Sequence, residues 1–395
     1  GAAPEKRETY WAPRFAPDTA MAYDEAVEGV RRRLCRAVEL RLRADVPVAF
    51  CLSGGVDSNA VAGVARRVLG YDAEAFTVLV DDPRYDERAA VDAAVAALGL
   101  RHHYVRPERA GFLERLRELV QQHDGPVSTI SYYAHWHVMA AVHAAGYRVA
   151  VSGTGGDELF AGYYDHHLAY LAELRHDPTA QAAAREAWRA RVMPLVRTPA
   201  LRDAELFVAH PEFRDHLYLD GGRFARFLTG PWAEAFAERA FCADLLRNRM
   251  LNELCHEVVP VILHDDDLNA MYFSVENRAP FLDRDLVEFA YRIPTRWLVR
   301  DGFGKAVLRD AVRGIVPDAI VDNPRKVGFN APVEELLDMA NPAVRAEVLK
   351  DGPVFDLVDR ESLKALLEQP AFDNGESKFL FSVLNAKVFL EETGG

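Results

Sequence analysis

The residues Ser53-Gly54-Gly55-Val56-Asp57-Ser58 directly follow an apolar run at 46–52. Loop amides at the start of a helix bind anions, and two glycines let the backbone close around a phosphate group. The serine hydroxyls add hydrogen-bond donors, and Asp57 can hold Mg²⁺. Because the loop lacks the Gly-Lys-Ser/Thr ending of a P-loop NTPase, it does not predict transfer of a γ-phosphate. The motif predicts a phosphate-binding loop rather than an ordinary glycine-rich turn.

A second segment, Ser152-Gly153-Thr154-Gly155-Gly156-Asp157-Glu158-Leu159-Phe160, again combines glycines and acidic residues after an apolar run. If both runs are parallel strands, their carboxyl ends lie at one edge of a sheet, and Asp57 and Asp157 can face one cavity. Two carboxylates there suit Mg²⁺ bridging a triphosphate. The simpler alternative is a helix start at which Asp157 or Glu158 complements the helix dipole.

Short apolar runs alternate with helical patterns in the first 160 residues. We expect strands near 46–52, 74–80, 102–105 and 147–151, and helices near 22–43, 58–69, 86–98, 110–122 and 131–145. This alternation predicts an α/β fold with a doubly wound parallel sheet that is covered on both faces. Ligands of such sheets bind at the carboxyl ends of the strands, which is where Ser53 and Ser152 fall.

The pattern becomes largely helical after about residue 160. Helical blocks are expected at 164–194, 231–259, 284–291, 305–314, 332–349, 360–368 and 376–392. We therefore predict three parts. These are a linker-like arm over 1–20, an α/β core over 21–160, and a helical part over 161–395 that completes the domain.

Composition limits the classes of function. The chain has 395 residues, 50% of them hydrophobic, and a formal net charge of −13. Such an acidic protein is a poor candidate for non-specific nucleic-acid binding, and no apolar stretch approaches the ~20 residues of a membrane span. The four cysteines lie far apart, without zinc or disulfide spacing, which fits a reducing compartment. We expect a cytoplasmic protein without a nucleic-acid or membrane partner; a homodimer stays open.

Further segments follow in a recognisable order. They are Asp267-Leu268-Asn269-Ala270-Met271, Ser274-Val275-Glu276-Asn277-Arg278-Ala279-Pro280-Phe281-Leu282-Asp283, Gly304-Lys305-Ala306-Val307-Leu308-Arg309 and Arg325-Lys326-Val327-Gly328-Phe329. Together with the two glycine-rich segments, they resemble the synthetase domain of the asparagine synthetase family over roughly residues 10–390. The resemblance implies a core of the ATP-pyrophosphatase type, which is adenine nucleotide α-hydrolase-like.

The resemblance also implies a two-step ligation that uses ATP and Mg²⁺. A substrate carboxylate attacks the α-phosphate of ATP, which gives an acyl-adenylate and pyrophosphate. Ammonia then displaces AMP to form an amide. The partners would be a small carboxylic acid and ammonia.

Carried over by position, the resemblance assigns most roles to the two loops and to two later lysines. Nucleotide contacts would come from Leu52, Ser53, Gly54, Gly55, Val56, Asp57, Ser58, Val78, Ser152, Gly153, Lys305 and Arg325. The catalytic set would be Asp57, Asp157, Glu158 and Lys326, with Asp57 and Asp157 as ligands of Mg²⁺. Substrate contacts would come from Thr154, Asp267 and Arg278. Two alternatives stay open: Arg278 pairs with Glu276 or Asp283 to fix its loop, or Lys305 is a surface helix residue.

Thr154 departs from the family pattern. Asparagine synthetases usually carry Glu or Asp at this position, near the incoming amine, and β-lactam-forming relatives carry Tyr. Threonine has neither acid–base character nor a phenol, so Glu158, His166 or a substrate group would replace the missing base. The stretch from Thr154 to His167 looks more like family branches that amidate sugar uronic acids in surface-polysaccharide pathways. We therefore expect a sugar uronic acid first, and aspartate second, as the substrate.

The N-terminal glutaminase domain that supplies ammonia in this family is not present in the sequence. Residue 1 is Gly rather than Met, and the earliest cysteine, Cys35, lies in a helical pattern. We expect a synthetase part that was cut from a longer protein or that works with a separate glutaminase domain or subunit.

Three other functions compete with ammonia-dependent amide formation. Intramolecular amide closure, as in lactam synthetases, would use the same acyl-adenylate without ammonia. A tRNA-modifying ATP pyrophosphatase is disfavoured by the acidic charge and by the lack of a basic or zinc-binding appendage. A non-catalytic scaffold is disfavoured by the intact Asp57, Asp157 and Lys326.

One further cluster needs an interpretation. Asp165-His166-His167 is expected to be polar helix surface or a substrate contact rather than a metal site, because no third ligand spacing accompanies it.

Overall fold

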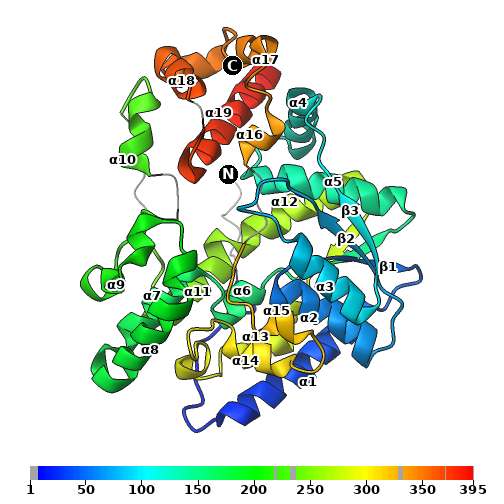
Figure 1. Cartoon of the computed structure of the whole chain (residues 1–395), viewed down its shortest axis with the longest axis vertical. Coiled ribbons are helices and arrows are strands. Elements are labelled where there is room, and N and C mark those ends of the chain that lie inside the picture. The colour runs from blue at the N-terminus through cyan, green and yellow to red at the C-terminus, as the bar shows by residue number, and fades with distance from the viewer. Residues whose placement is uncertain (1–7, 218–219, 232–236, 328–331, 370, 395) are drawn as a thin grey trace.

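The computed structural model describes residues 8–217, 220–231, 237–327, 332–369 and 371–394. Its centre is a sheet of parallel strands in the order β3-β2-β1-β4-β5 (Figure 1). The strands are β1 (Val48–Cys51), β2 (Glu74–Val78), β3 (Arg101–Val105), β4 (Val149–Val151) and β5 (Glu276–Arg278). The predicted α/β fold with a parallel sheet is confirmed. Strand β5 is an addition that the sequence pattern does not predict, because its three residues are all polar.

The strands alternate their side chains between two hydrophobic layers. Val48 and Phe50 of β1 enter the layer that contains α1 (Tyr23–Arg41), α2 (Val56–Gly63), α13 (Arg284–Ala290) and α14 (Ala306–Ala311). Ala49 enters the opposite layer, together with Met139 of α5 (Ile130–Ala144) and Ala270 of α12 (Val259–Tyr272). Helices therefore cover both faces of the sheet, as a doubly wound pattern predicts.

The other helices of the first half are α3 (Arg88–Leu98), α4 (Phe112–His123) and α6 (Gly156–Phe160), and α2 continues as a π-helix over Val64–Val68. The second half contains α7 (Tyr164–Glu173), α8 (Pro178–Arg191), α9 (Leu206–Ala209), α10 (Gly221–Phe224), α11 (Leu245–Asn252), α15 (Asp318–Val321), α16 (Val333–Leu336), α17 (Pro342–Val348), α18 (Arg360–Leu367) and α19 (Asn374–Thr393). A π-helix over Glu253–Glu257 links α11 to α12.

Three of the expected helical blocks are interrupted, including the one at 332–349, which forms two helices, α16 and α17. The block at 164–194 is split because Asp177 caps α8, accepting a hydrogen bond of 3.0 Å from the Ala180 amide, and Pro178 occupies its first turn. In the block at 231–259, residues 232–236 lie outside the described ranges, and the helix begins only at Leu245, after its cap Asp244. Short polar side chains therefore set these helix starts.

A second hydrophobic core lies apart from the sheet. Phe379 and Leu380 of α19 belong to it together with Leu116 of α4 and Leu336 of α16. Figure 1 shows α17, α18 and α19 gathered beside α4 at the top of the molecule, away from β1. The later helices thus form a second lobe around α19.

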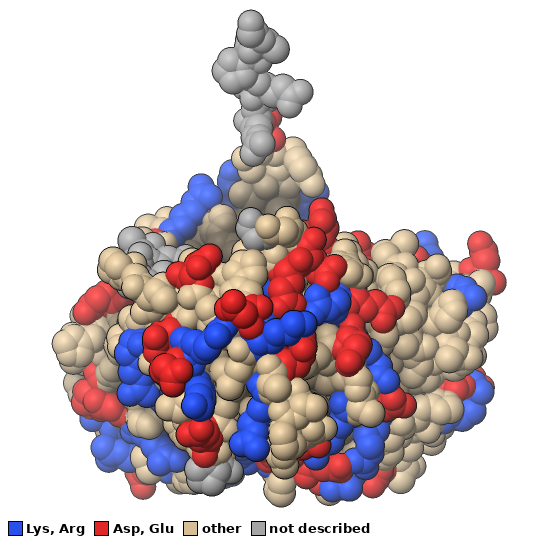
Figure 2. Space-filling model, turned by 90° about the horizontal axis from the view of Figure 1, so that it is seen from above, with Lys and Arg blue, Asp and Glu red and all other residues tan. Residues whose placement is uncertain are grey.

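The face over this lobe carries charges of both signs. Figure 2, which looks down on the molecule from above, shows acidic and basic side chains intermixed. In this lobe, Arg117 of α4 lies 2.9 Å from Glu391 of α19, and Arg360 lies 2.5 Å from Asp351. Among the described residues, no helix combines the length and the apolar character that crossing a bilayer requires.

The packing of α1 on α13 generates a test of the fold. A Cβ atom added at Gly29 would lie 2.1 Å from Cζ of Phe289, and Arg33 covers the same ring at 4.0 Å. We expect Gly29→Ala to destabilise the protein, because overpacking costs about 1–3 kcal/mol and outweighs the ~1 kcal/mol that alanine gains over glycine in a helix. Urea unfolding measures the change.

The control is the same substitution in a Phe289→Leu background. Leucine leaves room for the methyl group, so Gly29→Ala should then raise the free energy of unfolding. A loss of equal size in both backgrounds would contradict the packing argument.

Candidate active site

The two glycine-rich loops meet at the carboxyl ends of β1 and β4. Pairing of Phe50 with Val151 sets the strands in register, so that the loops emerge side by side. A Cβ atom at Gly153 would lie 2.7 Å from the Ser58 amide nitrogen, and one at Gly156 would lie 2.6 Å from Cγ of Asp57. Only glycine permits this approach, which explains the second glycine-rich segment.

The first loop is braced by its own polar side chains. The Ser53 amide donates to Ser58 Oγ at 3.0 Å, and the Gly55 amide donates to Ser53 Oγ at 3.2 Å. Asn59 is fully buried, and its Nδ2 donates to the carbonyls of Ser53 at 2.8 Å and Gly55 at 2.7 Å. These bonds brace the loop from within. Sequence reasoning missed Asn59, although it directly follows the motif.

Four charged groups form the centre of the site. Lys305 Nζ lies 2.6 Å from Asp157 Oδ1 and also donates to Asp57. Lys326 Nζ donates to Asp157 Oδ2 at 2.6 Å. Lys305 is 5% exposed, so the alternative of a surface helix residue is wrong. The backbone of α14 explains this placement, because the Lys305 amide is bonded to the Phe160 carbonyl at 3.0 Å and α14 starts one residue later.

Burial and the lysines act in opposite directions on the two carboxyl groups. Burial raises the pKa of Asp57 above its ordinary value, and Asp157 adds to this, while Lys305 opposes it. Burial also pushes up the pKa of Asp157, but Lys305 and Lys326 outweigh it and hold that pKa below its ordinary value. Asp157 is therefore an anion paired with two cations.

The donor set fits a magnesium ion bound together with a triphosphate. Mg²⁺ prefers oxygen ligands and commonly combines one or two carboxylates with substrate phosphates. Asp57 Oδ1 is buried and has no hydrogen-bond partner among the described residues, so one ligand oxygen is available. Asp57 and Asp157 are the residues that would hold the ion.

Glu158 follows Asp157 on the same short helix, α6. It is 1% exposed, and the Tyr163 hydroxyl donates to its Oε1 at 2.5 Å. Burial raises the pKa of Glu158 to about 7, and the charge of Asp157 contributes. The ring of Tyr163 lies under Lys326 Nζ at 5.6 Å. Sequence reasoning missed Tyr163, because nothing in its local pattern distinguishes it from a packing aromatic.

Tyr164 ties the lysine loop to α7. The Lys326 amide donates to Tyr164 Oη at 3.0 Å, and the Tyr164 hydroxyl donates to the Lys326 carbonyl at 3.1 Å. The backbone on both sides of this lysine is thereby fixed. Gly328 and Phe329, which complete the motif that starts at Arg325, lie outside the described residues.

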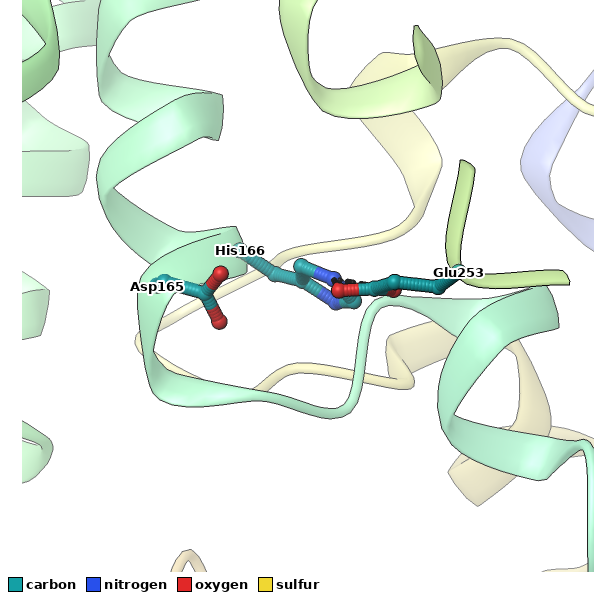
Figure 3. A group of neighbouring side chains, drawn as sticks. All are labelled: Asp165, His166 and Glu253. Atoms are coloured by element: carbon teal, nitrogen blue, oxygen red, sulfur yellow. Dashed lines mark hydrogen bonds and ion pairs between the residues drawn. The ribbon is translucent and has the colours of Figure 1, made fainter. Parts of the chain in front are cut away.

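Asp165, His166 and His167 are buried, so the expectation of polar helix surface is wrong. The physical reason is that α7 packs between neighbouring helices and is covered by α11. Figure 3 shows the His166 ring directed at Glu253, with Asp165 beside it. His166 Nε2 lies 2.9 Å from Glu253 Oε2. Burial lowers the pKa of His166, but the Glu253 carboxylate outweighs burial and holds that pKa above its ordinary value.

These three residues could be read as metal ligands, since their candidate ligand atoms lie within 4.8 Å of one another. Their charges are already matched, however. Arg249 Nε donates to Glu253 Oε1 at 3.1 Å, and His216 Nε2 lies 3.1 Å from Asp165 Oδ2. We interpret the cluster as a buried ion network that packs against Tyr163, because the ring centroids of Tyr163 and His166 are 5.1 Å apart.

A cavity of about 360 Å³ opens beside the second loop. It is lined by Ser152, Thr154, Leu263, His264, Asp266, Asp267, Asn277 and Ala279. The structure thus brings together Thr154 and Asp267, which were both predicted as substrate contacts. Thr154 Oγ1 lies 3.0 Å from Ser152 Oγ and brings no ionisable group to the cavity.

Arg278 is not brought together with these residues. Asn277 and Ala279 line the cavity, and the residue between them on β5 faces away. Arg278 Nη1 donates to the carbonyls of Arg41 at 2.6 Å and Arg43 at 3.0 Å, and its Nε donates to Glu276 at 2.9 Å. The structure therefore supports the alternative of pairing with Glu276.

The remaining nucleotide contacts are placed at the neighbouring strand ends. Leu52 follows β1 and Val78 ends β2, and Thr77 Oγ1 donates to the Leu52 carbonyl at 2.7 Å. Arg325 is exposed, and its Nη2 donates to the carbonyl of Arg84 at 3.1 Å. It contacts the loop that follows β2 rather than the two glycine-rich loops.

The central lysine generates a stability test. Lys305→Met leaves two largely buried carboxylates, whose side chains are 12% and 13% exposed, without their shared cation, and breaking a buried pair typically costs about 3–5 kcal/mol. Excess Mg²⁺ should restore part of the loss, because Asp57 and Asp157 offer it oxygen ligands. Urea unfolding with and without MgCl₂ measures both effects.

Lys387→Met is the matched control. Lys387 is also 5% exposed and lies 2.6 Å from one carboxylate, Glu391, in the second lobe. Its loss should be insensitive to Mg²⁺. Equal recovery of both variants by Mg²⁺, or an unchanged Lys305→Met variant, would contradict the assignment.

Comparison with known proteins is consistent with this geometry. The family model described as asparagine synthase matches residues 29–391. A Penicillium rubens protein named amidase chyE is 27% identical over 372 residues, 82% of this chain and 55% of that protein. Asparagine synthetase (glutamine-hydrolyzing) 1 of Bacillus subtilis is 26% identical over 397 residues, 95% of this chain and 61% of that protein.

Amidase chry2 of Gibberella zeae is 25% identical over 403 residues, 85% of this chain and 59% of that protein. The chain thus spans 55 to 61% of the length of these relatives. Because the family model covers both glycine-rich loops, both lysines and nearly all of the helical part, the chain belongs to the asparagine synthase family.

Proposed function

We propose that this chain is an ATP-dependent amide ligase. It adenylates a substrate carboxylate, releases pyrophosphate and transfers ammonia to the acyl group, with AMP as the by-product. The observation that supports this most is that the Ser53–Ser58 loop and the Ser152–Phe160 segment meet. Their carboxylates, Asp57 and Asp157, both pair with Lys305, and Asp157 also pairs with Lys326. Adenylation gathers several negative charges in one cleft, and two fixed cations stabilise them.

The residues have distinct proposed roles. Ser53, Gly54, Gly55 and Ser58 surround the pyrophosphate. When bound, Mg²⁺ on Asp57 and Asp157 supplies charge neutralisation and geometric alignment of the phosphates. Lys326 is held by Tyr164 and by Asp157, so its ammonium group is positioned before the substrate arrives. Such pre-organisation is what makes a charged group effective in a buried site.

Glu158 and Tyr163 are the proposed proton acceptor for the second step. The amine nitrogen attacks the acyl carbon, a C–N bond forms, and the C–O bond to AMP breaks. The proton that leaves the nitrogen passes to the Tyr163 oxygen as the Tyr163 proton moves to Glu158, along the 2.5 Å hydrogen bond. This pair would replace the side chain that relatives carry at the position of Thr154.

The substrate is proposed to be a sugar uronic acid first and aspartate second. Asp266, Asp267 and Asn277 in the cavity beside Thr154 offer several hydrogen-bond acceptors. Such acceptors suit the hydroxyl groups of a sugar, or the ammonium group of aspartate. Ammonia is proposed to come from a glutaminase domain or subunit, as the name of the Bacillus relative implies for that protein.

The test is release of AMP and pyrophosphate with Mg-ATP, ammonium and a panel of acids. The panel holds aspartate, hexuronic acids and nucleotide-linked uronates, with products weighed by mass spectrometry. We expect ammonium-dependent AMP release and a carboxylate-to-amide mass change with one acid. Lys326→Met should lower this rate by about 10²–10³-fold, the usual cost of a lost charge-stabilising donor, and the exposed Lys364→Met should not change it.

Two results would redirect the proposal. AMP release with loss of water and no need for ammonium indicates ring closure within one substrate. No turnover with any acid would favour a missing partner or a scaffold role.

The proton acceptor is tested by separating the two steps. Glu158→Gln and Tyr163→Phe should lower amide formation by about 10²–10⁴-fold, the usual contribution of general base catalysis. Acid-dependent exchange between ATP and pyrophosphate reports only adenylation and should stay within about threefold. Tyr147→Phe is the matched control, because the Tyr147 hydroxyl donates to the buried Glu74 at 2.8 Å outside the site. Parallel loss of exchange and amide formation would instead indicate a structural role.

A further inference from the structure

A second cavity lies outside the candidate active site. This α7–α8 cavity measures about 420 Å³ and is lined by residues within 167–171 of α7, 183–188 of α8 and 296–302, and by Tyr23 of α1 (Figure 1). Among the described residues, its lining shares none with the cavity beside Thr154. Sites that bind small molecules commonly measure about 300–1,000 Å³. The α7–α8 cavity is therefore large enough for a ligand of its own.

The walls of the α7–α8 cavity are mostly apolar. Four of the lining residues are aromatic, namely Tyr23, Tyr170, Trp188 and Trp297. Tyr23 and Trp297 meet edge to face, with ring centroids 5.4 Å apart. Three alanines of α8, at positions 183, 184 and 187, leave space because their side chains end at Cβ. Aromatic rings separated by small residues suit a ligand with an aromatic body.

Two buried residues of the lining have a polar atom without a partner. Among the described residues, neither Nδ1 of His167 nor Nε1 of Trp188 has a hydrogen-bond partner. His167 is 6% exposed and Trp188 is 2% exposed. Burial lowers the pKa of His167 to about 3, so its ring is neutral and carries one N–H, and the indole N–H of Trp188 only donates. Buried polar groups normally have partners, so these two indicate a ligand that accepts hydrogen bonds.

Charge favours an acidic ligand. Two exposed arginines, Arg296 and Arg300, line the α7–α8 cavity, and Asp301 is the one acidic residue among the described lining residues. Because the aspartate lies 3.6 Å from Arg300, two cations face one anion. The guanidinium of Arg296 lies 4.7 Å from the ring centre of Trp297, and that of Arg300 lies 4.8 Å from the ring centre of Tyr23. Positive charge is thus held beside the aromatic walls.

The lining also packs against the segment that carries Lys305. A Cβ atom added at Gly304 would lie 2.5 Å from the Ala161 carbonyl oxygen and 3.3 Å from Nε2 of His167. The Ala306 amide, one residue beyond Lys305, donates to the Leu298 carbonyl at 3.0 Å. A ligand in the α7–α8 cavity is therefore expected to restrict the motion of residues 304–306.

We propose that the α7–α8 cavity binds a small ligand that combines an aromatic body with a carboxylate group. The aromatic rings and the alanines of α8 contact the body. The two arginines attract the carboxylate, and the N–H groups of His167 and Trp188 donate hydrogen bonds to the ligand. This site is separate from the one at which the amide is proposed to form, so the acid bound here is not the acid that is adenylated.

The first test is calorimetry of the whole chain with naphthoate and with the uncharged naphthamide. We expect naphthoate to bind about tenfold tighter, because hydrogen bonds to a charged acceptor are stronger than those to a neutral one. Replacing both arginines, Arg296→Gln with Arg300→Gln, should remove this preference and leave the affinity for naphthamide within about twofold. Arg175→Gln with Arg189→Gln is the matched control, because both residues are exposed and neither lines the cavity.

The second test fills the cavity. Ala183→Leu should weaken the binding of both probes by about tenfold or more, because its side chain occupies part of the space that the body of the ligand needs. Ala182→Leu makes the same change at the neighbouring exposed position of α8, which does not line the cavity, and should stay within about twofold. Leucine is nearly as good a helix former as alanine, so α8 should persist in both variants.

Hydrogen exchange locates the bound probe. Naphthoate should slow exchange of the amides of Lys305 and Ala306, and leave the amides of α19 in the second lobe unchanged, because a ligand suppresses local opening where it binds. Three results would overturn the inference: no binding of naphthoate to the unmodified chain, equal weakening by Ala182→Leu and Ala183→Leu, or a preference for naphthoate that survives loss of both arginines.

Discussion

The structure of the site depends on one ammonium group held between two buried carboxylates. Lys305 joins the loop after β1 to the loop after β4 by pairing with Asp57 and with one carboxylate oxygen of Asp157. Lys326 pairs with the other carboxylate oxygen of Asp157. Two anions and two cations balance without any ligand. Burying Asp57 and Asp157 would otherwise be prohibitive, because an unpaired buried charge costs several kcal/mol. The close approach at Gly153 and Gly156 is possible because neither residue has a Cβ atom, which would lie 2.7 Å from the Ser58 amide nitrogen and 2.6 Å from Cγ of Asp57.

The carboxylates and the cations come from different halves of the sequence. Asp57 and Asp157 follow strands of the sheet, whereas Lys305 and Lys326 are on segments that pack onto it from the later helical part. Strand β5 and helices α12 to α14 also come from that part and complete both faces of the sheet. The charge balance of the site therefore depends on the later part of the chain, which supplies both lysines.

Much of this arrangement could be predicted from the sequence. The two glycine-rich loops and four strands were expected where they occur, because apolar runs followed by glycine and aspartate are local signals. Local signals fail where a role depends on a distant partner. Strand β5 is polar throughout and is a strand only because it pairs with β4. From the sequence alone Lys305 resembles a surface lysine, because its burial depends on the packing of α14. Arg278 ends β5 and faces away from the cavity, which its two neighbours Asn277 and Ala279 line.

Tyr163 and the His166–Glu253 pair show a further limit of local patterns. Each has a partner that the sequence gives no reason to connect with it: Glu158 for the tyrosine, and a residue 87 positions away for His166. Their importance arises from desolvation, since a buried polar group must find a partner wherever the fold supplies one. The polar groups that the sequence leaves unexplained are therefore the ones whose partners only the fold brings together.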